Sequence, residues 1–89
     1  MNLIFRNFYG KERIIGNPKN REEVFENIHA FKDECNAKRI DGKTFEIYYI
    51  RMWKEENRMK FDFGSHSEFI YAELVEDETW ESVDLDIRR

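Results

Sequence analysis

The sequence predicts a single α+β domain, in which one helix packs on one face of an antiparallel sheet of about five strands in the order β-β-α-β-β-β. Three observations predict this class. A segment between residues 20 and 37 carries apolar residues at helical spacing, short segments on both sides of it are rich in aromatic and β-branched residues, and turn-forming residues separate these segments. With 89 residues there is room for one small core.

The chain begins with a predicted β-hairpin. Residues 3–8 are rich in large apolar side chains and form the first expected strand, and Gly10 supplies the turn because glycine adopts positive φ at little cost. Residues 13–15 form the short returning strand. Pro18 ends the hairpin, since proline cannot donate a hydrogen bond to a sheet.

The helix is indicated by a cap and by its apolar spacing. Asn20 followed three residues later by Glu23 resembles a capping box. The apolar face that follows is expected to pack on the sheet; it consists of Val24, Phe25, Ile28, Phe31 and Cys35. Residues 36–37 are expected to close the helix, and residues 40–43 to turn the chain.

Three more strands are expected after the helix. Residues 44–54 form a long predicted strand with apolar side chains on both faces, which is typical of a central strand. Residues 55–57 fit a three-residue hairpin loop with Asn57 in the left-handed conformation. Residues 58–63 alternate between apolar and polar side chains, and residues 69–75 form the last expected strand.

The net charge of −4 is concentrated at one end of the chain. Residues 1–72 carry 13 basic and 12 acidic residues, whereas residues 73–89 carry 2 basic and 7 acidic residues. We therefore expect a domain at residues 1–75 and an acidic C-terminal extension at residues 76–89. No apolar run approaches the roughly 20 residues of a membrane-spanning helix, and the lone Cys35 fits a reducing cytoplasm.

The segment Gly64-Ser65-His66-Ser67 lies between two apolar runs and is the main candidate for chemistry. A serine could act as nucleophile with His66 as its base, or the hydroxyl and N–H groups could hold an anion. A plain turn explains the same residues, and we favour it because neighbours on one turn rarely converge as catalysis requires. The histidines lie in no metal-ligand spacing, so neither a metal nor a cofactor is expected.

Two motifs carry a family resemblance. YYIRMW at residues 48–53 and FDFGSHSEFIY at residues 61–71 resemble a set of short, uncharacterised proteins encoded by phages and prophages of low-GC Gram-positive bacteria. The resemblance covers roughly residues 40–74, with a looser similarity in the helix. It implies a mobile-element origin and a bacterial cytoplasm, but no activity that could be transferred. Such proteins tend to stop soon after the final strand, whereas this chain continues.

The extension combines acidic and apolar residues, and two interpretations remain open. The favoured one is that its few apolar residues dock back on the domain. The other is an acidic-aromatic surface for a basic partner, because clustered carboxylates can imitate a phosphate backbone and tryptophan is a common interface anchor. A divalent-cation site is disfavoured. The partner-binding candidates are Glu76, Asp77, Glu78, Trp80, Glu81, Asp84 and Asp86.

Basic residues also cluster around the expected hairpin of residues 44–63. Basic side chains interleaved with aromatic ones can bind single-stranded nucleic acid by charge and stacking. The overall acidity of the chain opposes this, so nucleic acid is not an expected partner. The residues concerned are Tyr48, Arg51, Trp53, Lys54, Arg58 and Lys60.

The leading functional hypothesis is a small, non-enzymatic phage or mobile-element protein that binds a host macromolecule, as an inhibitor of a host defence or nucleic-acid-processing protein. The alternative is a module that binds a small anionic ligand such as a nucleotide. An enzyme ranks third, since its case rests on His66. A homodimer is allowed by the open sheet edges. The ligand-binding candidates are Arg51, Gly64, Ser65, His66 and Ser67.

Overall fold

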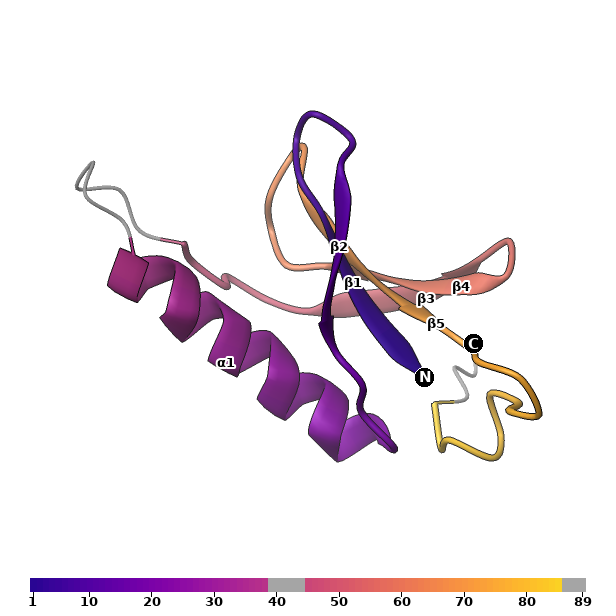
Figure 1. Ribbon diagram of the computed structural model, residues 1–89. Coiled ribbons are helices and arrows are strands. Elements are labelled where there is room, and N and C mark those ends of the chain that lie inside the picture. The colour runs from indigo at the N-terminus through magenta and orange to yellow at the C-terminus, as the bar shows by residue number, and fades with distance from the viewer. Residues whose placement is uncertain (39–44, 86–89) are drawn as a thin grey trace.

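The computed structural model describes residues 1–38 and 45–85 and confirms the predicted α+β class (Figure 1). Its elements are β1 (Asn2–Arg6), β2 (Glu12–Gly16), α1 (Arg21–Lys38), β3 (Arg51–Glu55), β4 (Arg58–Asp62) and β5 (Phe69–Glu73). The strands form one antiparallel sheet in the order β2-β1-β5-β4-β3, so the last strand of the chain is the central one. α1 lies along one face of this sheet (Figure 1).

The core lies between α1 and the sheet. Alternate side chains of β1, β4 and β5 face the helix because successive residues of a strand point to opposite sides. Leu3, Phe61 and Ile70 are fully buried there, and Val24 and Ile28 of α1 pack against them. α1, the helix of the described part of the chain, is neither long nor apolar enough to cross a membrane.

The predicted cap of the helix is present in a modified form. Asn20 Oδ1 accepts a hydrogen bond from Glu23 N at 2.9 Å, and Glu23 Oε1 accepts one from Lys19 N at 3.1 Å. The glutamate therefore reaches the residue before the cap rather than the cap itself. The helix continues to Lys38, one residue past the predicted end, and the expected turn at residues 40–43 lies outside the described residues.

The prediction for residues 44–54 is wrong in length and in position. Only Arg51–Glu55 forms a strand, residues 45–50 have no regular structure, and β3 lies at the edge of the sheet rather than at its centre. The apolar pattern misled because the second face of this strand is not covered by a further layer. The hairpin loop has two residues, and Glu56, not Asn57, has positive φ, at 57°.

The segment that follows β5 docks on the domain. Trp80, Val83 and Leu85 are buried in the same core as the sheet and the helix, so the core extends past the predicted boundary at residue 75. A tight turn holds them, in which Leu85 N donates to Trp80 O at 2.9 Å. Docking back is thus the arrangement that the structure shows for this segment.

One ion pair anchors the docked segment to the first strand. The Met1 ammonium lies 2.9 Å from a carboxylate oxygen of Glu78 and also donates to Pro18 O. Val75 N donates to the same carboxylate at 2.9 Å. The hydrogen bonds from Val75 and then from Met1 hold the pKa of Glu78 below its usual value.

Candidate binding groove on the open face of the sheet

No described element covers the face of the sheet opposite α1, which we call the open face. Pairing across the strands sets its rows, because residues directly opposite each other in an antiparallel pair share a face. One row joins Ile4, Tyr71, Lys60 and Trp53, and the next places Arg6 beside Phe69. The open face therefore gathers basic and aromatic side chains from four of the five strands.

Lys60 lies at the centre of the aromatic side chains. Its Nζ is 4.1 Å from the ring centroid of Phe69 and 5.8 Å from those of Trp53 and Tyr71. Such cation–π contacts fix the ammonium over the sheet. The Glu55 carboxylate lies 3.5 Å from Nζ, so part of the lysine charge is neutralised within the domain.

Arg58 is fully committed to neighbouring carboxylates. Its guanidinium lies 2.8 Å from Glu12 and 3.0 Å from Glu73, and it covers the ring of Tyr71 at 5.2 Å. Hydrogen bonds to Glu12 and then to Glu73 raise the pKa of Arg58, and the same contact with Arg58 lowers the pKa of Glu12. Arg58 thus braces β2 against β4 and β5 and offers little free charge to a ligand.

Arg51 is also paired. Its guanidinium lies 2.7 Å from Asp62 and stacks over Tyr49 at 5.0 Å. Hydrogen bonds from Arg51 and then from Gly64 N hold the pKa of Asp62 below its usual value.

Arg6 differs from these three cations. It is exposed at the end of β1, and within residues 1–38 and 45–85 no carboxylate lies within 4.0 Å of its guanidinium. A Cβ atom built on Gly10 would lie 3.7 Å from Arg6 Nη2, which places the guanidinium against the β1–β2 turn. Among the described residues Arg6 therefore makes no ion pair within 4.0 Å. Glu12 lies opposite it in the β1–β2 pairing, and the charge of Arg6 contributes, after the hydrogen bond from Arg58, to lowering the pKa of Glu12.

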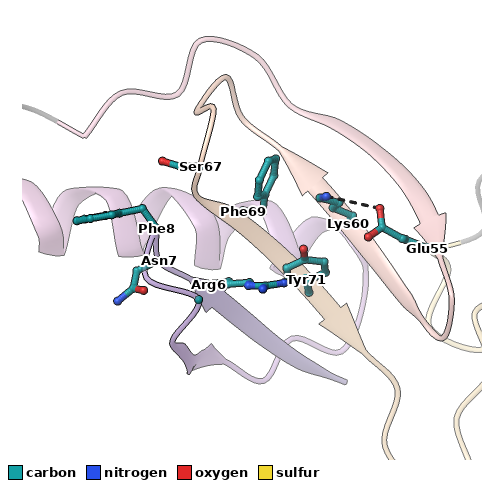
Figure 2. Close-up of a pocket in the computed structure, with 9 residues that line it drawn as sticks. Arg6, Asn7, Phe8, Glu55, Lys60, Ser67, Phe69 and Tyr71 are labelled. Atoms are coloured by element: carbon teal, nitrogen blue, oxygen red, sulfur yellow. Dashed lines mark ion pairs between the residues drawn. The ribbon is translucent and has the colours of Figure 1, made fainter.

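A hollow of about 300 Å³ opens beside Arg6, and we call it the groove (Figure 2). This volume is at the lower end of the range for small-molecule sites. Its lining combines two cations, one carboxylate, three aromatic rings, two uncharged polar side chains and a glycine: Arg6, Asn7, Phe8, Gly10, Glu55, Lys60, Ser67, Phe69 and Tyr71. A neighbouring hollow of about 250 Å³ shares Arg6, Glu55 and Tyr71 and adds Glu56 and Arg58.

The Gly64–Ser67 segment forms a self-contained turn. Ser65 Oγ accepts hydrogen bonds from Ser67 N at 3.4 Å and from Glu68 N at 3.1 Å, and Gly64, with φ of 102°, donates to Asp62. His66 is exposed. Of the five residues predicted to bind a ligand, only Ser67 lines the groove, whereas Arg51, Gly64, Ser65 and His66 do not.

The residues predicted to bind a partner differ in exposure because their segment docks on the domain. Glu76, Asp77, Glu81 and Asp84 are exposed, whereas Glu78 is paired with the Met1 ammonium. Trp80 is only 9% exposed, because its large ring contributes to the core, so its indole is not presented as a surface anchor. Asp86 lies outside the described residues.

Sequence reasoning missed the residues that form the groove. Arg6, Phe8, Phe69 and Tyr71 lie in segments that were interpreted only as apolar strands. The available signal was that Phe69 and Tyr71 alternate along the strand with Ile70, which places their side chains on the opposite face. The predicted basic cluster is divided by the sheet: Arg51, Arg58 and Lys60 lie on the open face, whereas Lys54 is paired with Met59, whose side chain is in the core.

Comparison of the chain with protein-family models, with curated proteins and with solved structures gives no match. The resemblance to phage and prophage proteins stays a prediction.

Proposed function

We propose that the protein is a non-enzymatic binding module, and that its groove takes a small anionic ligand with a planar part, such as a nucleotide. The observation that carries this proposal is the unpaired guanidinium of Arg6 at the edge of an aromatic hollow. Every other cation of the open face that we have described contacts a carboxylate.

The two halves of such a ligand would meet different parts of the groove. A phosphate would lie against Arg6, because a guanidinium offers a planar fork of donors that matches phosphate oxygens. The ammonium of Lys60 is the second cation of the lining. A planar ring would contact Phe69 and Phe8, which supply the apolar walls.

Binding of mononucleotides tests the proposal directly. Titration of AMP, GMP, CMP and UMP, with inorganic phosphate as a separate arm, should give saturable binding by isothermal calorimetry. Arg6→Gln should weaken it by about ten- to a hundredfold, because a hydrogen-bonded ion pair contributes about 1.5–3 kcal/mol.

Arg21→Gln is the matched control, since Arg21 is an exposed arginine of α1 that stacks on Phe25 on the other layer of the domain. Its affinity should equal that of the wild type. The proposal is refuted if no nucleotide binds at millimolar concentration, or if Arg6→Gln and Arg21→Gln bind equally well. If inorganic phosphate binds as tightly as the nucleotides, the aromatic side chains of the groove contribute nothing to affinity.

A second candidate function is the binding of a basic host protein, as expected for an inhibitor from a phage or mobile element. One observation favours it: Glu76, Asp77, Glu81 and Asp84 are all exposed on a segment that the core holds in place. Carboxylates fixed in space lose little conformational freedom on binding, which is the advantage of a preorganised surface.

Charge variants of the full-length chain test this second function. Replacing these four acids by their amides should abolish capture of a partner from bacterial lysate, read by mass spectrometry at low and moderate salt. Glu22→Gln with Glu26→Gln is the control, because both residues are exposed acids of α1. A partner that the fourfold variant retains as well as the control would exclude this surface.

A further inference from the structure

We infer that the groove is one end of a longer site and that its ligand is a single-stranded nucleic acid of at least two nucleotides. In this arrangement the second base lies against the paired, tilted rings of Phe8 and Tyr9 at the tip of the β1–β2 hairpin. This inference rests on the proposed nucleotide-binding function and names the class of polymer that the same site takes.

The hairpin tip displays two large aromatic side chains to solvent. Phe8 is 58% exposed and Tyr9 is 76% exposed, and their ring centroids lie 4.0 Å apart with an interplanar angle of 36°. An exposed aromatic surface of this kind is the stacking platform that proteins use for single-stranded bases, because every base has a π face.

Hydrogen bonds fix the backbone of the tip. Asn7 Oδ1 accepts hydrogen bonds from Tyr9 N at 2.9 Å and from Lys11 N at 3.0 Å. Asn7 O accepts one from Gly10 N at 2.9 Å, and Gly10 completes the turn with φ of 83°. The backbone that carries the two rings is thus preorganised, so little backbone entropy is lost when a base stacks there.

The tip and the groove are continuous through Arg6. Phe8 and Gly10 line the groove, and Arg6 Nη2 lies next to Gly10. A phosphate bound by Arg6 would therefore lie between a base in the groove and a base on the tip. That spacing, with one phosphate between two stacked or buried rings, is what a dinucleotide offers.

The local charge permits a polyanion at this end of the sheet. Residues 1–11 contain Arg6 and Lys11 and no acid, and Glu12, which follows and lies opposite Arg6, is paired with Arg58. The acidic segment of residues 76–85 lies at the opposite end, because Asn2 pairs with Glu73 whereas Arg6 pairs with Phe69 (Figure 1). The net charge of −4, which argued against nucleic acid, is therefore located away from the tip.

Charge also indicates toward which side the bound nucleic acid leaves the groove. Glu55 lines both hollows, and the neighbouring one adds the carboxylate of Glu56 at the β3–β4 loop, so that repulsion of phosphates is stronger there. The chain of nucleotides would leave the groove toward the basic hairpin tip instead.

A length series tests the inference. Thymidine monophosphate and oligothymidylates of two, four and six nucleotides would be titrated by fluorescence anisotropy in competition, at fixed low salt. Affinity should rise about tenfold from one to two nucleotides, as expected for one additional stacked base. Tyr9→Ala should abolish this gain and leave the affinity for the mononucleotide unchanged, since Tyr9 does not line the groove.

Tyr48→Ala is the matched control, because Tyr48 is equally exposed, at 75%, and lies outside the site. It should keep the length dependence. Binding of the mononucleotide without a gain in the dinucleotide, or a gain that Tyr9→Ala retains, would overturn the inference and leave the groove proposal intact. Failure of both the mononucleotide and the oligonucleotides to bind would overturn the two together.

Discussion

Leu85→Ala should lower the free energy of unfolding by about 2.5 kcal/mol, because Leu85 is fully buried although it lies 12 residues past the end of β5. Leucine-to-alanine changes in a core cost roughly 2–5 kcal/mol. We take the lower half of that range, since Leu85 sits in an irregular turn that can settle into the space. A domain of this size has a total stability of about 4–13 kcal/mol, so the loss is a substantial part of it.

Urea denaturation followed by far-UV circular dichroism measures this loss of free energy. In a thermal melt, the melting temperature should fall by roughly 10–20 °C. Val75→Ala is the matched control, because Val75 is an exposed aliphatic residue of the same segment. Its stability should stay within about 0.5 kcal/mol of the wild type. If Leu85→Ala falls within that same margin, the docking of residues 76–85 is refuted, together with the reasoning on the acidic surface that depends on it.

Two further changes test the anchor of the docked segment and a glycine turn. Because the pKa of Glu78 is lowered in the folded state, its contribution to stability is complete above the ordinary glutamate pKa and is lost as the pH falls through the lowered value. Glu78→Gln, which cannot pair with the Met1 ammonium, should therefore lose less stability between pH 6 and pH 3 than the wild type does; an identical pH profile would contradict this. Gly64→Ala should destabilise the protein by at least about 1 kcal/mol more than Gly10→Ala, both measured by urea denaturation. Both glycines have positive φ, but only a Cβ at Gly64 would collide with Tyr48, at 2.9 Å, and equal losses would show that this contact relaxes freely.

The docked segment decides how the acidic surface can be studied. A chain cut at residue 75 would lose Trp80, Val83 and Leu85 from the core and the Glu78 carboxylate from the Met1 ammonium. Such a truncation should unfold or weaken the domain, so a lost interaction could not be assigned to the surface. Charge variants of the full chain, such as the fourfold amide variant, keep the core intact and avoid this ambiguity.

Most of the basic side chains on the open face are paired with carboxylates. Arg51, Arg58 and Lys60 belong to the basic cluster that the sequence singled out, yet each one contacts a carboxylate of a neighbouring strand or loop. Arg6, which that reasoning passed over, lines the groove and makes no ion pair within 4.0 Å among the described residues. The availability of a charge depends on its partners across the sheet, and such a partner can be distant in the sequence: Arg58 and Glu12 lie 46 residues apart.

Local sequence was sufficient for the elements whose signals are local. The helix followed from the Asn20 cap and the spacing of Val24, Ile28 and Phe31, because helical contacts join residues three and four apart. The first hairpin and the fourth and fifth strands followed from alternation and from turn residues such as Gly10. The α+β class followed from the order of these elements.

The tertiary structure decided what depends on neighbours in space. The composition of residues 44–54 predicted a central strand, but strand order is set by which faces are covered, and β5 took the centre while β3 became an edge. The composition of residues 76–89 predicted an acidic extension whose few apolar residues dock back on the domain, and the structure shows where they dock: Trp80 and Leu85 lie in the core with Met1 and residues of the sheet. Periodicity tells which side chains of a strand share a face; only the packed sheet determines which face is buried and which charge on the other face is left unpaired.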